Sequence, residues 1–173
     1  MTILKKQGAG AWICLAALVF ALIALILYGT AVSAGDKLQI ASGSELFYDM
    51  TRPEDSAMGP VVVPCAVLAI LFLAAGLILG QIRMEGTAGK VRDVCSGILR
   101  IAAPALLAIA LFYFLYGSFT GIGWTFFSNA ELAINPQATA VGTQVVTCLV
   151  FFALAMIGAA VAAYFEIPKK AAQ

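Results

Sequence analysis

The chain contains no histidine and few charged residues. Without histidine it cannot build histidine-ligated haem, a histidine proton relay or a histidine–carboxylate metal site. The sequence also lacks a glycine-rich phosphate loop with its Lys-Ser or Lys-Thr ending, and no serine or cysteine has a recognisable base partner. We therefore expect a protein that is not an enzyme and that binds no metal or cofactor.

Charged residues make up only 11% of the chain, whereas soluble domains carry roughly 25%. Hydrophobic residues make up 62%, which leaves too little polar surface to face water. Membrane lipid is therefore the expected solvent. The formal net charge of +1 gives no reason to expect a nucleic-acid partner.

Four apolar runs are long enough to cross a bilayer, because a helix needs about 20 residues to span roughly 30 Å of hydrocarbon. Backbone groups in lipid must bond within their own segment, which requires helices, and the runs lack the alternation of a membrane β-barrel. The sequence thus predicts an all-α polytopic membrane protein with four transmembrane helices. The runs cover residues 12–32, 60–82, 97–118 and 142–165.

The basic residues lie mostly on one side of this predicted topology, which indicates the cytoplasmic side. We therefore expect both termini and the 83–95 loop in the cytoplasm, and segments 33–59 and 119–141 outside. The short loops and alanine-rich runs favour the plasma (inner) membrane of a bacterium. The cytoplasmic basic residues are Lys5, Lys6, Arg83, Lys90, Arg92, Arg100, Lys169 and Lys170, against Lys37 and Arg52 outside.

The first apolar run has an alternative interpretation as a secretory signal. Lys5 and Lys6 precede it, and the sequence VSAGD follows, with a cleavage position after Ala34. Signal cores are usually about 7–15 residues long, shorter than this run. We therefore favour a retained membrane span.

Two pairs of similar segments indicate an internal duplication. LYGT at 27–30 resembles LYGS at 115–118, and GPVVVPC at 59–65 resembles GTQVVTC at 142–148. We predict two parallel tandem helical hairpins in one membrane domain, related by a pseudo-two-fold axis along the membrane normal. The first repeat covers 11–82 and the second 95–166, with a cytoplasmic loop at 83–95 and a short tail at 167–173.

Small residues are expected to form the helix contacts, because lipid gives apolar helices no hydrophobic reason to associate. The second and fourth runs each carry a small-xxx-small pair, with a cysteine 11 residues before it on the same helix face. The alternative to packing is a Cys65–Cys148 pair that exchanges electrons with a thiol outside the membrane. The predicted packing residues are Gly76, Gly80, Ala159, Ala163, Cys65 and Cys148.

Aromatic residues near the outer ends of the spans are expected at the membrane interface, where tyrosine and tryptophan are enriched. The alternative is that they contact a ligand or a partner protein. These residues are Tyr28, Tyr116, Trp124, Phe126 and Phe127.

Three charges lie near the cytoplasmic ends of the spans. Arg83 and Glu166 occupy equivalent positions in the two repeats and could form an ion pair that closes this end. Arg100, about one turn inside the third run, is expected to reach lipid phosphates or to bind an anion.

The leading functional hypothesis is an integral membrane protein without catalytic groups, either an accessory or assembly subunit or a self-associating helical bundle. Its partners would be membrane lipid and another membrane protein or further copies of itself. The alternative is a transporter or channel for a small solute, with an apolar substrate as one option, acting as an oligomer. In that hypothesis Pro64 and Pro104 would break two helices that line a path.

Overall fold

The computed structural model describes residues 8–34, 58–82, 86–128 and 136–165. Four of its helices are long and apolar enough to cross a membrane. This confirms the expectation of an all-helical chain with four helices of membrane-spanning length, for the described residues. The elements are α1 (Ala9–Val32), α3 (Met58–Gln81), α4 (Gly86–Gly123), the π-helical turn η4 (Trp124–Ser128) and α5 (Pro136–Tyr164).

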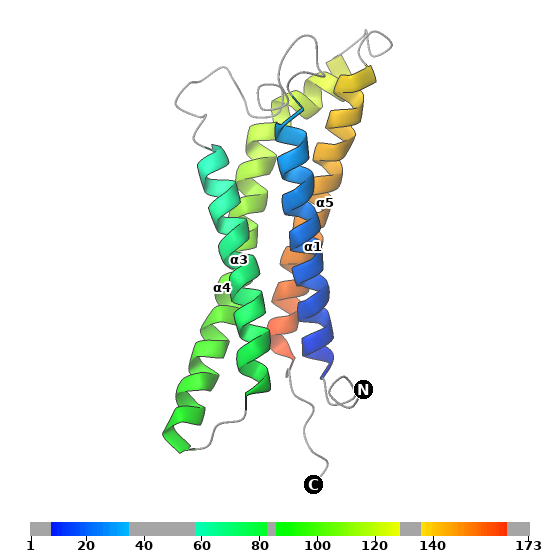
Figure 1. Ribbon diagram of the computed structural model, residues 1–173. Coiled ribbons are helices and arrows are strands. Elements are labelled where there is room, and N and C mark those ends of the chain that lie inside the picture. The colour runs from blue at the N-terminus through cyan, green and yellow to red at the C-terminus, as the bar shows by residue number, and fades with distance from the viewer. Residues whose placement is uncertain (1–7, 35–57, 83–85, 129–135, 166–173) are drawn as a thin grey trace.

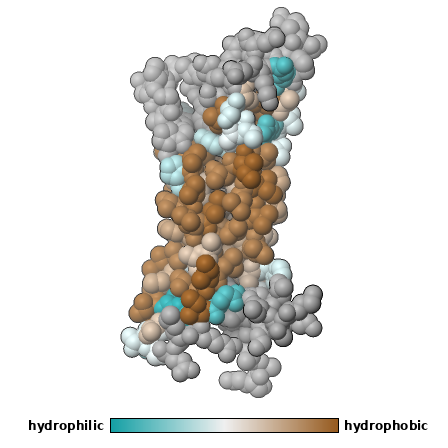
Figure 2. Space-filling model, in the orientation of Figure 1, coloured by the Kyte–Doolittle hydropathy of each residue, from teal (hydrophilic) through white to brown (hydrophobic). Residues whose placement is uncertain are grey.

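The helices form one elongated bundle whose middle is apolar on the face seen in Figure 2, with hydrophilic residues towards the two ends. Helices that are hydrophobic on all sides are typical of a membrane environment. At 1.5 Å per residue, the 24 residues of α1 extend about 36 Å, which is enough to cross the hydrocarbon layer.

Each helix packs against two antiparallel neighbours, in the order α1, α5, α4, α3 around the bundle. The most extensive contacts join α1 with α5 and α3 with α4. Each predicted hairpin therefore makes its closest contacts with the other hairpin. The helix α1 begins at the end of the bundle where α5 finishes (Figure 1).

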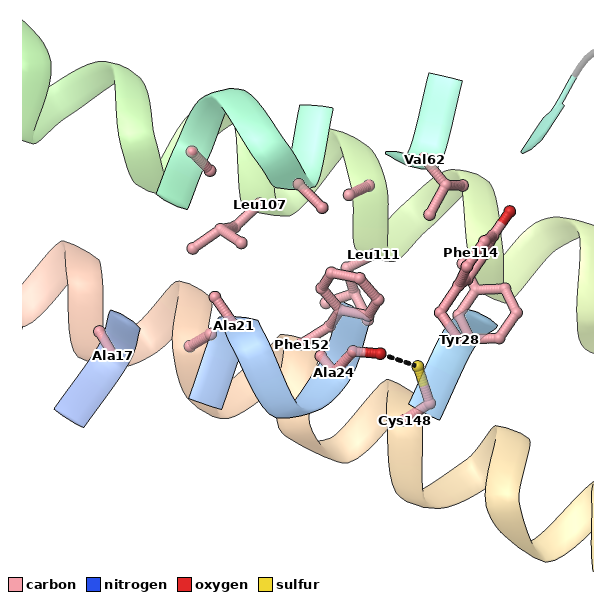
Figure 3. Packing of buried hydrophobic residues seen from close by; sticks show 14 of the residues in the cluster. Ala17, Ala21, Ala24, Tyr28, Val62, Leu107, Leu111, Phe114, Cys148 and Phe152 are labelled. Carbon is pink, nitrogen blue, oxygen red and sulfur yellow. Dashed lines mark hydrogen bonds between the residues drawn. The ribbon is translucent and has the colours of Figure 1, made fainter. Parts of the chain in front are cut away.

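The centre of the bundle is filled by aromatic and aliphatic side chains set among alanines. Phe114 of α4 packs edge-on against Tyr28 of α1, with ring centroids 5.1 Å apart. It also packs against Phe152 of α5 at 6.4 Å, so three helices meet at one ring (Figure 3). Leu107 and Val62 are fully buried beside this cluster.

Candidate functional site

The most extensive helix contact in the bundle is the α1–α5 seam. Ala17, Ala21 and Ala24 recur every three or four residues along α1 and are completely or almost completely buried. A Cβ atom added to Gly158 of α5 would lie 3.3 Å from the Cβ of Ala17. Small side chains on both helices therefore allow the two backbones to approach, as expected for association in lipid.

The predicted packing residues occupy positions of differing burial. Gly76, Ala159 and Cys148 are buried, whereas Gly80, Ala163 and Cys65 are half-buried. The space beside Gly76 is taken by an arginine side chain, because an added Cβ would lie 3.5 Å from Cγ of Arg100.

The two cysteines singled out in the sequence are both free thiols. The Cys148 thiol donates a hydrogen bond to the backbone carbonyl of Ala24, with Sγ 3.2 Å from the oxygen (Figure 3). Cys14 makes a similar, longer contact of 3.8 Å from Sγ to the Leu73 carbonyl oxygen. Buried thiols thus link α1 to both of its neighbours.

The two pairs of repeated segments differ in how their residues are buried. For the pair with an offset of 83 residues (142 − 59), equivalent positions of α3 and α5 face inward together. Val62 and Val145 are both fully buried, as are Ala69 and Phe152. The α3 and α5 segments therefore present the same face to the core.

The Leu-Tyr-Gly pair behaves differently. Tyr28 is 5% exposed and belongs to the aromatic core, whereas Tyr116 is 64% exposed on the outside of α4. The two tyrosines therefore have different environments, although their local sequences match. Of the two tyrosines, only Tyr116 lies on the outer surface of the bundle, where it can contact the membrane interface or a partner protein.

The other three aromatic residues lie in η4. Phe127 is 86% exposed, whereas Trp124 and Phe126 are half-buried. The ring of Phe126 packs on α5, since a Cβ added to Gly142 would lie 3.1 Å from its Cε2 atom. This turn therefore holds α4 against α5 and leaves Phe127 as its outward-facing aromatic.

Near the same end of the bundle, one polar contact joins two helices, and hydroxyl groups also bond within their own helix. The side-chain amide of Gln144 on α5 donates to the hydroxyl of Thr30 on α1. The Thr30 hydroxyl in turn lies 2.9 Å from the Leu27 carbonyl oxygen. Ser118 is buried and donates to the Phe114 carbonyl at 2.7 Å. Each of these polar groups thus has a hydrogen-bond partner within the bundle.

Two arginines of α4 bind the last carbonyls of neighbouring helices at the opposite end. Arg100 donates to the carbonyls of Ala162 and Phe165, at the end of α5. Arg92 donates to the carbonyl of Ile82, just after α3. The final carbonyls of a helix lack partners within the helix and carry its negative dipole end, so both contacts are favourable.

The Arg100 contact differs from both sequence-based expectations, which assigned its guanidinium to lipid phosphate or to a bound anion. The signal that could have found it is the position of an arginine one turn inside an apolar run, beside the end of an antiparallel helix. Arg83 and Glu166, the predicted ion pair, lie outside the described residues.

Within residues 8–34, 58–82, 86–128 and 136–165, no group of three or more metal-ligating side chains comes together. Comparison of the chain with protein-family models, curated proteins and solved structures gives no match. Functional inference therefore rests on the geometry of the bundle.

Proposed function

We propose that the chain is an integral membrane protein without catalytic groups that acts as an accessory or assembly subunit, or as a self-associating helical bundle. The observation that carries this proposal is the filled interior. Its largest fully buried side chains include Phe114, Phe152 and Leu107. Among the described residues, the buried polar side chains are Ser118 and Thr125. Since the described interior is occupied by apolar side chains, we place recognition on the outer surface of the bundle.

We propose that the bundle lies in a plasma membrane and that the end where α1 begins faces the cytoplasm. Lys90, Arg92 and Arg100 support it, because they lie at that end and positive residues favour the cytoplasmic side. Lys90→Cys should react with a membrane-impermeant maleimide only after cells are opened. The exposed Gln137 is the control at the opposite end, and Gln137→Cys should react on intact cells. The reverse labelling pattern would overturn the orientation.

We further propose that the two halves are a parallel repeat of one hairpin. The common burial pattern of α3 and α5 at an offset of 83 residues (142 − 59) supports this relationship. The different environments of Tyr28 and Tyr116 imply that α1 and α4 have diverged in which face they bury. Parallel repeats enter the membrane from the same side, in agreement with the proposed orientation.

The alternative function is transport of a small solute, with an apolar substrate as one option. In the described part of the chain, both prolines lie within unbroken helices, Pro64 on the exposed side of α3 and Pro104 half-buried in α4. Neither proline breaks its helix, which does not favour a role in lining an internal path. A transport path would then have to run between copies of the chain. This version of the hypothesis also requires self-association, which makes association the first property to measure.

The experiment is co-isolation of two differently tagged copies expressed in the same membrane and cross-linked before solubilisation. Self-association predicts that one tag recovers the other, whereas separately expressed copies mixed after solubilisation should not exchange. A subunit role predicts a defined cross-linked complex with a second protein. Recovery of single copies only, with no cross-linked partner in native membranes, would refute both forms of the proposal.

A further inference from the structure

The outward face of α4 is longer than that of any other helix in the described chain. Its strongly exposed apolar residues extend from Val91 to Phe119, a rise of about 42 Å at 1.5 Å per residue. The corresponding stretch of α3, from Val63 to Ile78, rises only about 23 Å. A hydrocarbon core is roughly 30 Å thick, so it covers the α3 surface but not the whole of the α4 surface.

The excess length lies at the end of the bundle where α5 finishes. Arg100 binds the carbonyls of Ala162 and Phe165, which places it level with Tyr164. Tyr164 is 90% exposed and is the type of residue found at a membrane interface. Val94 and Val91 precede Arg100 by six and nine residues, or about 9 and 14 Å of helix. They therefore lie beyond the level of this interface.

This terminal part of α4 is amphipathic, and its apolar side faces away from the bundle. Val91, Val94 and Ile98 are 57–61% exposed and share one helix face through their i, i+3, i+7 spacing. Arg92 and Arg100 lie on the other side, where they bind the ends of α3 and α5. A water-exposed extension would have the opposite arrangement, with its apolar face against the bundle.

The position of this segment indicates what covers the apolar face. The same face continues without interruption into the outward surface of the span, through Ile101 and Phe112. In Figure 1 the first turns of α4 lean away from the other helices. A segment that leans outward in this way would turn its outer side obliquely towards a bilayer placed around the spans. Lys90, exposed beside the face, can reach lipid phosphate, as long basic side chains do at helix ends.

We propose that residues 86–99 of α4 lie in the headgroup layer of the bilayer, with Val91, Val94 and Ile98 at the acyl boundary and Lys90 towards anionic phosphates. Amphipathic helices bind membranes in this way, by apolar burial combined with attraction to anionic lipid. The segment is thus a lipid-binding extension of a membrane span, continuous with it and anchored to the bundle by Arg92 and Arg100.

The test is site-directed fluorescence on the full chain in vesicles of phosphatidylcholine and phosphatidylglycerol. Cys65 and Cys95 are replaced by alanine, and an environment-sensitive dye is attached to Val94→Cys or, as the matched control two residues away, to Ser96→Cys. The proposal predicts that a lipid carrying a nitroxide at the headgroup quenches the dye at position 94 severalfold more than the dye at 96. Aqueous iodide should show the opposite order.

A second copy covering this face would instead give energy transfer between labelled chains at position 94 and weak quenching by the lipid nitroxide, which would overturn the proposal. Equal quenching at positions 94 and 96 would overturn it as well.

The lipid charge provides an independent readout. Raising the phosphatidylglycerol fraction should shift the emission at position 94 further to the blue, and Lys90→Gln should remove most of this dependence. An undiminished dependence in that variant would exclude Lys90 as the phosphate contact.

Discussion

Replacement of Arg100 by methionine is expected to loosen the end of α5 and destabilise the whole bundle. Methionine keeps an unbranched apolar stem beside Gly76, where the Arg100 Cγ now packs. It removes the guanidinium that binds the carbonyls of Ala162 and Phe165. The substitution therefore separates the hydrogen bonds from the packing contribution.

The magnitude follows from the two bonds and their environment. Hydrogen bonds to a charged group contribute about 1.5–3 kcal/mol each when shielded, whereas hydrogen bonds measured within membrane proteins average about 0.6 kcal/mol. Both contacts use one nitrogen, and the Phe165 contact is exposed. We therefore use the smaller of these two values for each hydrogen bond. To their sum we add about 0.3–1 kcal/mol for the interaction of a cation with a helix C-terminus. The expected loss in free energy of unfolding is about 2 kcal/mol.

The assay is reversible unfolding of the full chain in mixed micelles, together with hydrogen exchange over the last turn of α5. Lys90→Met is the control, because it removes an exposed positive charge from the same helix. It should leave stability within about 0.5 kcal/mol of the original chain, as surface substitutions usually do. Arg100→Met at the stability of this control, with unchanged exchange at the end of α5, would refute the assigned role of Arg100.

Two further pairs of substitutions, each a test with its control, examine the α1–α5 seam and the core. Gly158→Ala should lower the free energy of unfolding by about 1–2 kcal/mol through overpacking against Ala17. Gly29→Ala, at a position with no neighbour within 4 Å, should be neutral or stabilising. Equal effects of the two substitutions on thermal unfolding would contradict the close α1–α5 contact. Phe152→Ala should cost about 2–3 kcal/mol, below the values for soluble cores because lipid is itself apolar. Phe112→Ala, at a residue 62% exposed, should cost much less in the same measurement, and a loss similar to that of Phe152→Ala would show that the core is elsewhere.

The sequence alone is sufficient to predict the four membrane-length helices, because their apolar runs are long and interrupted by charged segments. Gly76 and Ala159, predicted as packing positions from their spacing, are buried in the structure. Gly158 escapes such reasoning, since its importance depends on facing Ala17, 141 residues away (158 − 17). Local pattern cannot specify which helices become neighbours.

The two tyrosines illustrate the same limit. Matching Leu-Tyr-Gly segments favoured matching positions, yet Tyr28 packs on Phe114 while Tyr116 faces outward. A helix rotates by about 100° per residue, so a change of one or two residues in register exchanges a buried face for an exposed one. The contacts of Arg92 and Arg100 likewise depend on where the neighbouring helices end.

Disulfide cross-linking across the α1–α5 seam tests the central structural claim most directly. The Cβ positions of Ala17 and Gly158 lie 3.3 Å apart, close to the separation of about 3.5–4.5 Å that a disulfide requires. In a chain whose four native cysteines are replaced by alanine, Ala17→Cys with Gly158→Cys should cross-link within one copy upon mild oxidation in native membranes. Val19→Cys, at a position 43% exposed on α1, should not cross-link with Gly158→Cys. Cross-linking of the Val19 pair in preference to the Ala17 pair would contradict the packing of small residues that holds this bundle together.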